Sequence, residues 1–137
     1  MIELSQFYMG RDKTHAHILG SDLRANASRT VEAANKLLTL AKGAGVQLKP
    51  GQWGMVRSGW RPPDINGATK GASKTSLHMQ CLAVDLEDVD RSLARWCFAN
   101  QNVLKDLALW LEHPDTTPSW CHVQLKPPGS GKRVFRP

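Results

Sequence analysis

The sequence lacks the features that mark membrane and secreted proteins. Its longest apolar stretches, such as residues 37–41, are far shorter than the roughly 20 residues that a membrane-spanning helix needs. The N-terminal residues, Met1–Gln6, lack the basic start and the apolar core of a secretory signal. We therefore expect a chain with no transmembrane segment, made in a cytoplasm without a signal peptide.

Cysteine is scarce, and its spacing argues against disulfides and against a zinc ribbon. Cys81, Cys97 and Cys121 are odd in number and lie in separate segments, unlike the even framework of a small secreted disulfide protein. No Cys-x-x-Cys pair is present, which lowers the chance of a structural zinc ribbon. We expect buried, reduced thiols, and any metal would be held mainly by histidine and carboxylate.

The size and charge of the chain limit its organisation and its partners. A length of 137 residues fits one domain spanning residues 1–137, and 41% hydrophobic with 22% charged residues is a globular balance. The net charge of +6 favours polyanionic surroundings, among them nucleic acid, membrane surfaces and bacterial cell wall. The basic tail from Lys126 keeps a nucleic-acid-binding module as an alternative, although it carries no recognised nucleic-acid-binding motif.

Hydrophobic spacing predicts a mixture of helices and short strands. Apolar residues recur every three or four positions over residues 22–44, which predicts a helix that ends near Gly43 and Gly45. Asp88 or Asp90 is placed to cap a second helix, which we expect to break near Asn100. Irregular structure is expected for residues 62–75 and for the tail. The expected elements are helices over 22–44 and 91–111 and strands over 52–60, 82–86 and 120–125.

Three side chains that can bind zinc lie on separate segments: His78, Asp85 and His122. Two imidazoles and one carboxylate leave a fourth position for water, as a catalytic zinc site requires. Asp85 interrupts an apolar strand, and a buried carboxylate is unfavourable unless it is paired or coordinates a cation. His122 falls on the polar face of the strand over 120–125, away from Cys121 and Val123. The combination therefore indicates a metal centre.

At these residues the sequence resembles a family of zinc peptidases. Ser76-Leu77-His78, then Asp85 after a gap of six residues, then Trp120-Cys121-His122 is the order of motifs in the zinc D-alanyl-D-alanine carboxypeptidases and phage peptidoglycan endopeptidases (endolysins). These belong to the lysostaphin-type zinc metallopeptidases. Ser58-Gly59-Trp60-Arg61-Pro62 is similar to the Ser-Gly-Tyr/Trp-Arg segment of that family.

The resemblance implies an α+β fold in which a small antiparallel sheet, flanked by helices, carries one zinc ion. It implies a peptidase that hydrolyses peptidoglycan cross-links or D-Ala termini. The expected biology is a monomeric phage-type lysis enzyme, made in the host cytoplasm, which acts on the cell wall after the membrane is breached and has no stable nucleic-acid partner. Arg61 would face the substrate, where its guanidinium suits a carboxylate. Ser76 either shapes the turn before His78 or binds substrate.

One position departs from the family pattern. Members usually carry an acidic residue three positions before the second metal histidine, where it acts as general base, but the chain has Ser119 there. Serine is a poor base at neutral pH. Glu112 and Asp115 are the nearest acids upstream, and we prefer Asp115 because a carboxylate in a loop has more freedom to reach the zinc. A zinc-containing domain that binds wall peptides without cutting them is the alternative.

Overall fold

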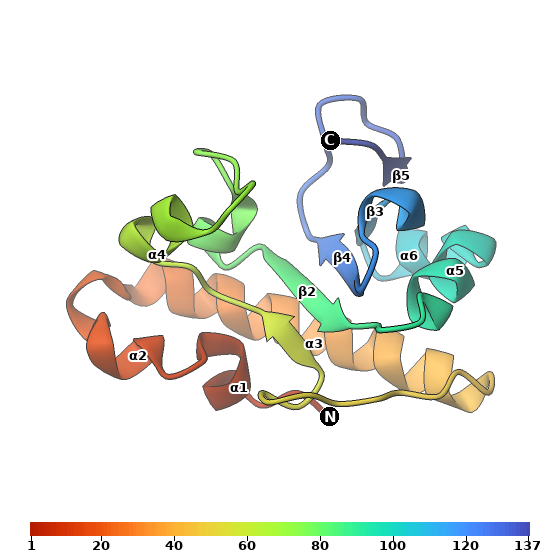
Figure 1. Cartoon of the computed structure of the whole chain (residues 1–137), viewed down its shortest axis with the longest axis horizontal. Coiled ribbons are helices and arrows are strands. Elements are labelled where there is room, and N and C mark those ends of the chain that lie inside the picture. Colours follow the sequence, from red (N-terminus) through yellow and green to blue (C-terminus); the bar gives the residue numbers. More distant parts are fainter.

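The computed structural model describes residues 1–137 as a five-stranded sheet with helices around it (Figure 1). The strands follow the order β1-β2-β4-β3-β5, and each pairing is antiparallel except that of β3 with β5, which is parallel. This confirms the predicted α+β fold with a small antiparallel sheet, to which β5 adds one parallel pairing. The strands are β1 Val56–Ser58, β2 Ala83–Glu87, β3 Trp110–Glu112, β4 Trp120–Gln124 and β5 Val134–Phe135.

The longest helix, α3, spans Ser21–Gly43 and buries the predicted apolar stripe, including Ala27, Ala34 and Leu38. No helix combines the length and the apolar composition that crossing a membrane requires. The other α-helices are α1 Leu4–Tyr8, α2 Arg11–Thr14, α4 Pro63–Ala68, α5 Ser92–Ala99 and α6 Gln101–Asp106. Short 3₁₀ helices are η1 Ala16–Ile18, η2 Leu77–Gln80 and η3 Pro114–Thr116.

One face of the sheet packs against α3 and α5 and forms the core with them. In the two central strands, Val84 lies opposite Val123 and Leu86 lies opposite Cys121, and all four are fully buried. The three cysteines are buried and free, as predicted. Because side chains alternate along a strand, the residues between these core positions point to the other face, away from α3.

Three segments differ from the structure expected from the sequence. Residues 63–68 form α4 within the predicted loop, because a proline in the first turn of a helix loses no hydrogen bond there. The predicted helix over 91–111 does break at Asn100, but its last residues form β3, since pairing with β4 overrides the local helical pattern. Residues 134–135 form β5 in the predicted irregular tail by pairing with β3.

Asp88 caps α5 from inside the protein. Its Oδ1 accepts a hydrogen bond from Leu93 N at 2.9 Å, and its Oδ2 accepts one from Ala94 N at 2.8 Å. Burial raises the pKa of Asp88, while these two backbone bonds favour its ionised form. Asp90 also caps the helix, by accepting from Ser92 N at 3.0 Å, but it is exposed.

We expect Asp88→Ala to destabilise the fold by about 2 kcal/mol, because it leaves two backbone N–H groups of α5 without their acceptor. Asp90→Ala is the matched control and should cause a smaller loss, because water can replace its exposed carboxylate. Urea unfolding followed by circular dichroism measures both. Equal losses in the two variants would contradict the role assigned to Asp88.

Candidate metal centre

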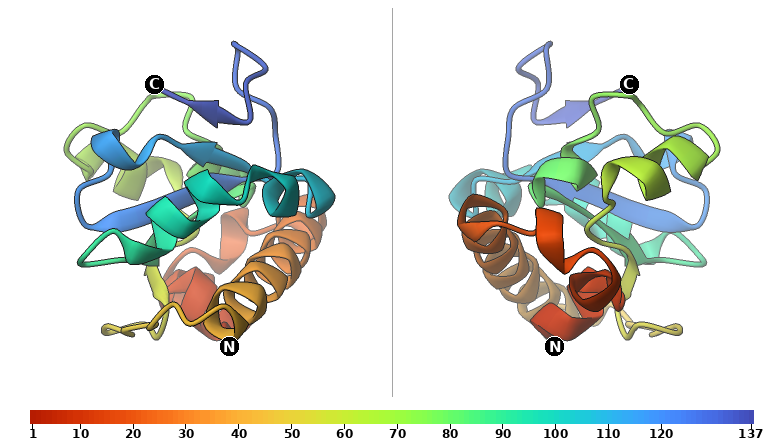
Figure 2. Two further views of the ribbon diagram at one scale, coloured as in Figure 1. Left: turned by 90° about the vertical axis from the view of Figure 1, so that its right-hand side faces the viewer. Right: turned by 90° about the vertical axis from the view of Figure 1, so that its left-hand side faces the viewer.

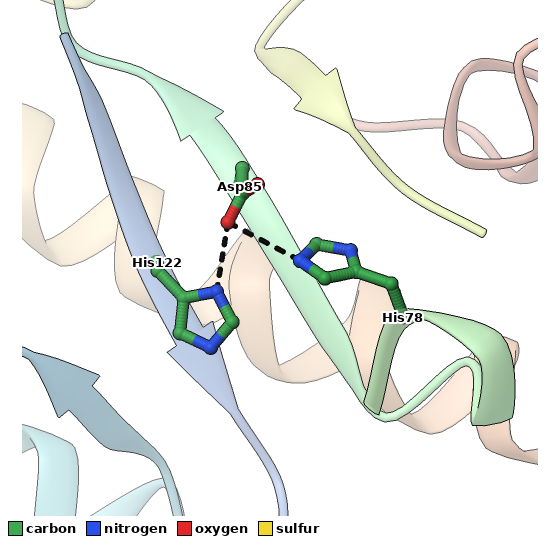
Figure 3. Close-up of side chains that lie close together, drawn as sticks. All are labelled: His78, Asp85 and His122. Carbon is green, nitrogen blue, oxygen red and sulfur yellow. Dashed lines mark hydrogen bonds and ion pairs between the residues drawn. The ribbon is translucent and has the colours of Figure 1, made fainter. Parts of the chain in front are cut away.

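The polar face of the central strands gathers the three predicted metal ligands (Figure 3). The register of β2 with β4 sets Asp85 directly opposite His122. His78 reaches the same point from η2, the short helix that precedes β2. Asp85 and His78 are buried, and His122 is half-buried.

The three side chains approach each other closely enough to share one ion. Asp85 Oδ1 lies 2.8 Å from His122 Nδ1 and 3.3 Å from His78 Nε2. One ligand atom from each residue lies within 4.8 Å of the others, so the group can hold a metal ion. Two imidazole nitrogens and one carboxylate oxygen are a donor set that suits zinc.

Each ligand also has a partner on its outer side. His78 Nδ1 lies 2.9 Å from the carbonyl oxygen of Gly59, and His122 Nε2 lies 2.8 Å from Gln124 Oε1. Asp85 Oδ2 accepts a hydrogen bond from Arg61 Nη2 at 3.2 Å. Such outer partners orient metal ligands and fix the tautomer of each histidine. The atoms that face inward are therefore the ones that a zinc ion would need, and the residues present fit this metal.

The charges of the ligands reinforce one another. Burial by itself would favour a neutral Asp85, but His78 and His122 outweigh that effect and hold its pKa well below the usual range. For His122, burial disfavours the charged form, while the hydrogen bond and the charge of Asp85 outweigh it and raise the pKa. Asp85 is therefore a permanent anion near neutral pH. A proton on His122 competes with a metal ion for the same nitrogen.

The N-terminal helix α1 supports the segment that holds His78. Trp60 N donates to the carbonyl oxygen of Phe7 at 3.1 Å, and Arg11 Nη1 donates to the carbonyl oxygen of Trp60 at 2.7 Å. A Cβ atom on Gly59 would lie 1.9 Å from the same Phe7 oxygen. Glycine is thus required at this position, where the backbone of α1 approaches the residue whose carbonyl orients His78.

The three predicted ligands lie in a cleft of about 1030 Å³. Arg61, Ser76 and Glu112 also line this cleft, whereas Asp115 and Ser119 do not. Only 4 of the 25 lining residues are hydrophobic, so the cleft suits a polar ligand.

Arg61 and Ser76 both contact the ligand set from within the protein. Arg61 donates through Nε to Ser58 Oγ at 2.9 Å as well as to Asp85, which fixes its guanidinium beside the ligand carboxylate. Ser76 Oγ accepts from the backbone N–H of His78 at 3.2 Å, so this serine shapes the turn before the histidine.

The two candidate bases lie in different surroundings. Trp110 pairs with Gln124 and Leu111 with Val123, and the same register continued by one residue sets Glu112 opposite His122. Residues opposite each other in an antiparallel pair point to the same face, so Glu112 faces the cleft. Asp115 is exposed and pairs with Arg136 at 3.2 Å. The structure therefore brings Glu112 to the metal ligands and places Asp115 outside the cleft lining.

Comparison with known protein families gives a match over most of the chain. A model of the family described as peptidase M15 matches residues 14–115. The matched range includes His78, Asp85 and Glu112, and it ends before His122. No curated protein and no solved structure matches the chain.

Gln124 belongs to the candidate site, and sequence reasoning missed it. The strand pattern placed it on the same face as His122. Nothing in the sequence showed that its side chain would hydrogen-bond both His122 and the backbone of Lys126. Its Oε1 lies 2.8 Å from His122 Nε2, and its Nε2 donates to the carbonyl oxygen of Lys126 at 2.8 Å. Gln124 thus holds the outer nitrogen of a metal ligand and the start of the following segment.

We expect Gln124→Leu to weaken zinc binding about 10- to 100-fold, because His122 loses the partner that orients its ring. Gln124→Glu should retain most of the affinity, since a carboxylate oxygen can accept from the same nitrogen. Competition with a zinc-binding dye measures both affinities, and Gln101→Leu on the exposed surface is the control. An unchanged affinity in Gln124→Leu would remove Gln124 from the metal centre.

Proposed function

The chain belongs to the peptidase M15 family, and from this premise we propose that it is a zinc-dependent peptidase that hydrolyses peptides of bacterial peptidoglycan. The observation that carries the proposal is the convergence of His78, Asp85 and His122 in a polar cleft. Zinc is the metal on which peptidases of this family depend, and the donor set fits it.

Zinc held by these three residues would supply Lewis acidity toward a peptide carbonyl and toward a water molecule. The chain's own residues keep Asp85 ionised and His78 oriented for binding the metal. Asp85 remains ionised because two histidines and Arg61 surround it. His78 presents Nε2 to the cleft because Nδ1 is engaged by Gly59. We propose Arg61 as a positioning residue for Asp85, and its place in the cleft lining also supports the substrate contact expected from the sequence.

We propose Glu112 as the general base, in place of Asp115. Its carboxylate would accept a proton from the attacking water and pass it to the nitrogen of the departing amine. Thr116 Oγ1 donates to Glu112 Oε2 at 3.0 Å, which holds one oxygen of the carboxylate. An acid opposite the metal histidine on the neighbouring strand can take the role that Ser119 cannot.

The proposed biological role is lysis of the cell wall by a phage-type enzyme. Buried, free cysteines agree with folding in a reducing cytoplasm before the enzyme meets its substrate. The polar lining of the cleft agrees with the amide and carboxyl groups of wall peptides.

We expect the purified protein to bind one zinc ion and to release peptide fragments from purified peptidoglycan. His78→Ala and His122→Ala should each lose the metal and the activity together, because two remaining ligands bind zinc weakly. His17→Ala, which removes an exposed histidine outside the cleft, is the matched control. Metal analysis and mass spectrometry of the released fragments provide the readouts. Stoichiometric zinc in His122→Ala would contradict the proposed site.

The same digest distinguishes the two kinds of peptidase. An endopeptidase that cuts cross-links lowers the turbidity of a wall suspension, whereas a carboxypeptidase releases D-alanine and leaves the turbidity unchanged. We propose the endopeptidase, in line with the lytic role, and release of D-alanine alone would assign the carboxypeptidase instead.

We expect Glu112→Gln to lower turnover by about 100- to 10,000-fold at unchanged zinc content, because a carboxamide cannot accept the proton. Asp115→Asn should keep turnover close to that of the parent, since Asp115 does not line the cleft and its carboxylate pairs with Arg136. Turnover of a defined peptide by metal-loaded proteins measures both. A loss in Asp115→Asn as large as that in Glu112→Gln would return the role of base to Asp115.

A further inference from the structure

Two segments form opposite walls above the polar face of the sheet. One wall follows α4 and comprises residues 69–76, and the other follows β4 and comprises residues 126–136. Both segments rise from the side of the sheet that faces away from α3 (Figure 2). Residues of both walls line the cleft that contains the metal ligands. A peptide lying across the metal centre would therefore contact one wall on each side of the bond that is cut.

Each wall contributes a lysine that has no partner in the protein. Lys70 lies on the first wall and Lys126 on the second, and both are exposed in the cleft lining. Neither side chain forms an ion pair or a hydrogen bond within the chain. The other two cations of the lining are already paired, Arg61 with Asp85 and Arg136 with Asp115. Free positive charge thus lies on both sides of the metal centre.

Resting on the proposed function, we propose that Lys70 and Lys126 determine specificity by binding carboxylate groups of the substrate on the two sides of the scissile bond. The preferred substrate class is then a peptide with a free carboxylate on each side, rather than a neutral or amidated one. Unpaired lysines in a polar cleft raise the local concentration of anionic ligands and favour their binding. Gln124 links this arrangement to the chemistry, because it hydrogen-bonds both His122 and the backbone of Lys126.

The test compares a synthetic wall peptide that carries both carboxylates with versions amidated at one position or at the other. Each amidation should lower kcat/KM by up to about fivefold, the contribution of one exposed ion pair. In Lys70→Gln, one of the two amidations should no longer lower kcat/KM. In Lys126→Gln, the other amidation should no longer lower it. The proposal would be overturned if both variants still responded to both amidations. It would also be overturned if a single variant lost its response to both.

Lys74→Gln and Lys132→Gln are the matched controls. Each removes one lysine from the same segment without touching the cleft lining, so the net charge changes equally. Both controls should discriminate between the acidic and the amidated peptides as the parent does. Equal loss of discrimination in the controls would show a general effect of charge and overturn the assignment of Lys70 and Lys126.

Binding separates this inference from the proposed catalysis. Calorimetric titration of the zinc-loaded Glu112→Gln protein with the same peptides should show about fivefold weaker binding after each amidation. Adding Lys70→Gln or Lys126→Gln should abolish one of these differences. If the parent enzyme cut no peptide while these binding differences held, the proposed peptidase function would fail and the carboxylate sites would stand. Equal affinity for acidic and amidated peptides would overturn the carboxylate sites, whatever the activity.

Discussion

The antiparallel pairing of β2 with β4 sets Asp85 opposite His122 and turns both side chains to the polar face of the sheet. A slip of one residue in either strand would turn that strand's ligand toward the core and expose its apolar residues. Burial of a valine or leucine side chain contributes about 2 kcal/mol, so the core positions of both strands oppose such a slip. Hydrophobic contacts on one face of the sheet therefore fix the geometry of the metal ligands on the other.

Asp85 connects the remaining parts of the site. A buried carboxylate needs compensating partners, and it finds them in Arg61 and in the two histidines. Arg61 and Gly59 belong to the same segment, which α1 holds through the carbonyl oxygen of Phe7. Helix α1, which contributes no residue to the cleft lining, thereby influences the position of His78. Arg61, His78 and His122 all contact the same carboxylate, so removal of any one of them would alter the surroundings of Asp85.

The sequence was sufficient to predict which three side chains the structure brings together, but not that Glu112 lies beside them. His78, Asp85 and His122 could be found because their spacing matched a known motif and because strand alternation put His122 on the polar face. Glu112 was expected at the end of a helix, since the apolar spacing over 91–111 is helical. Its true place depends on the pairing of β3 with β4, which joins residues far apart in the chain. The strand in the second wall could not be predicted for the same reason. β5 is only two residues long and forms by pairing with β3.

The three predicted ligands also lie at different positions along the sequence, so the ribosome adds them at different times. His78 and Asp85 lie in neighbouring elements, whereas His122 lies in β4, 37 positions beyond Asp85. While the ribosome is still making the intervening helices, the growing polypeptide offers only two of the three donors, and Asp85 has no strand beside it on that side. A metal ion that needs all three donors could therefore bind only after β4 has paired with β2. The complete donor set, and any reactivity that depends on it, therefore forms only once synthesis of the sheet is nearly complete.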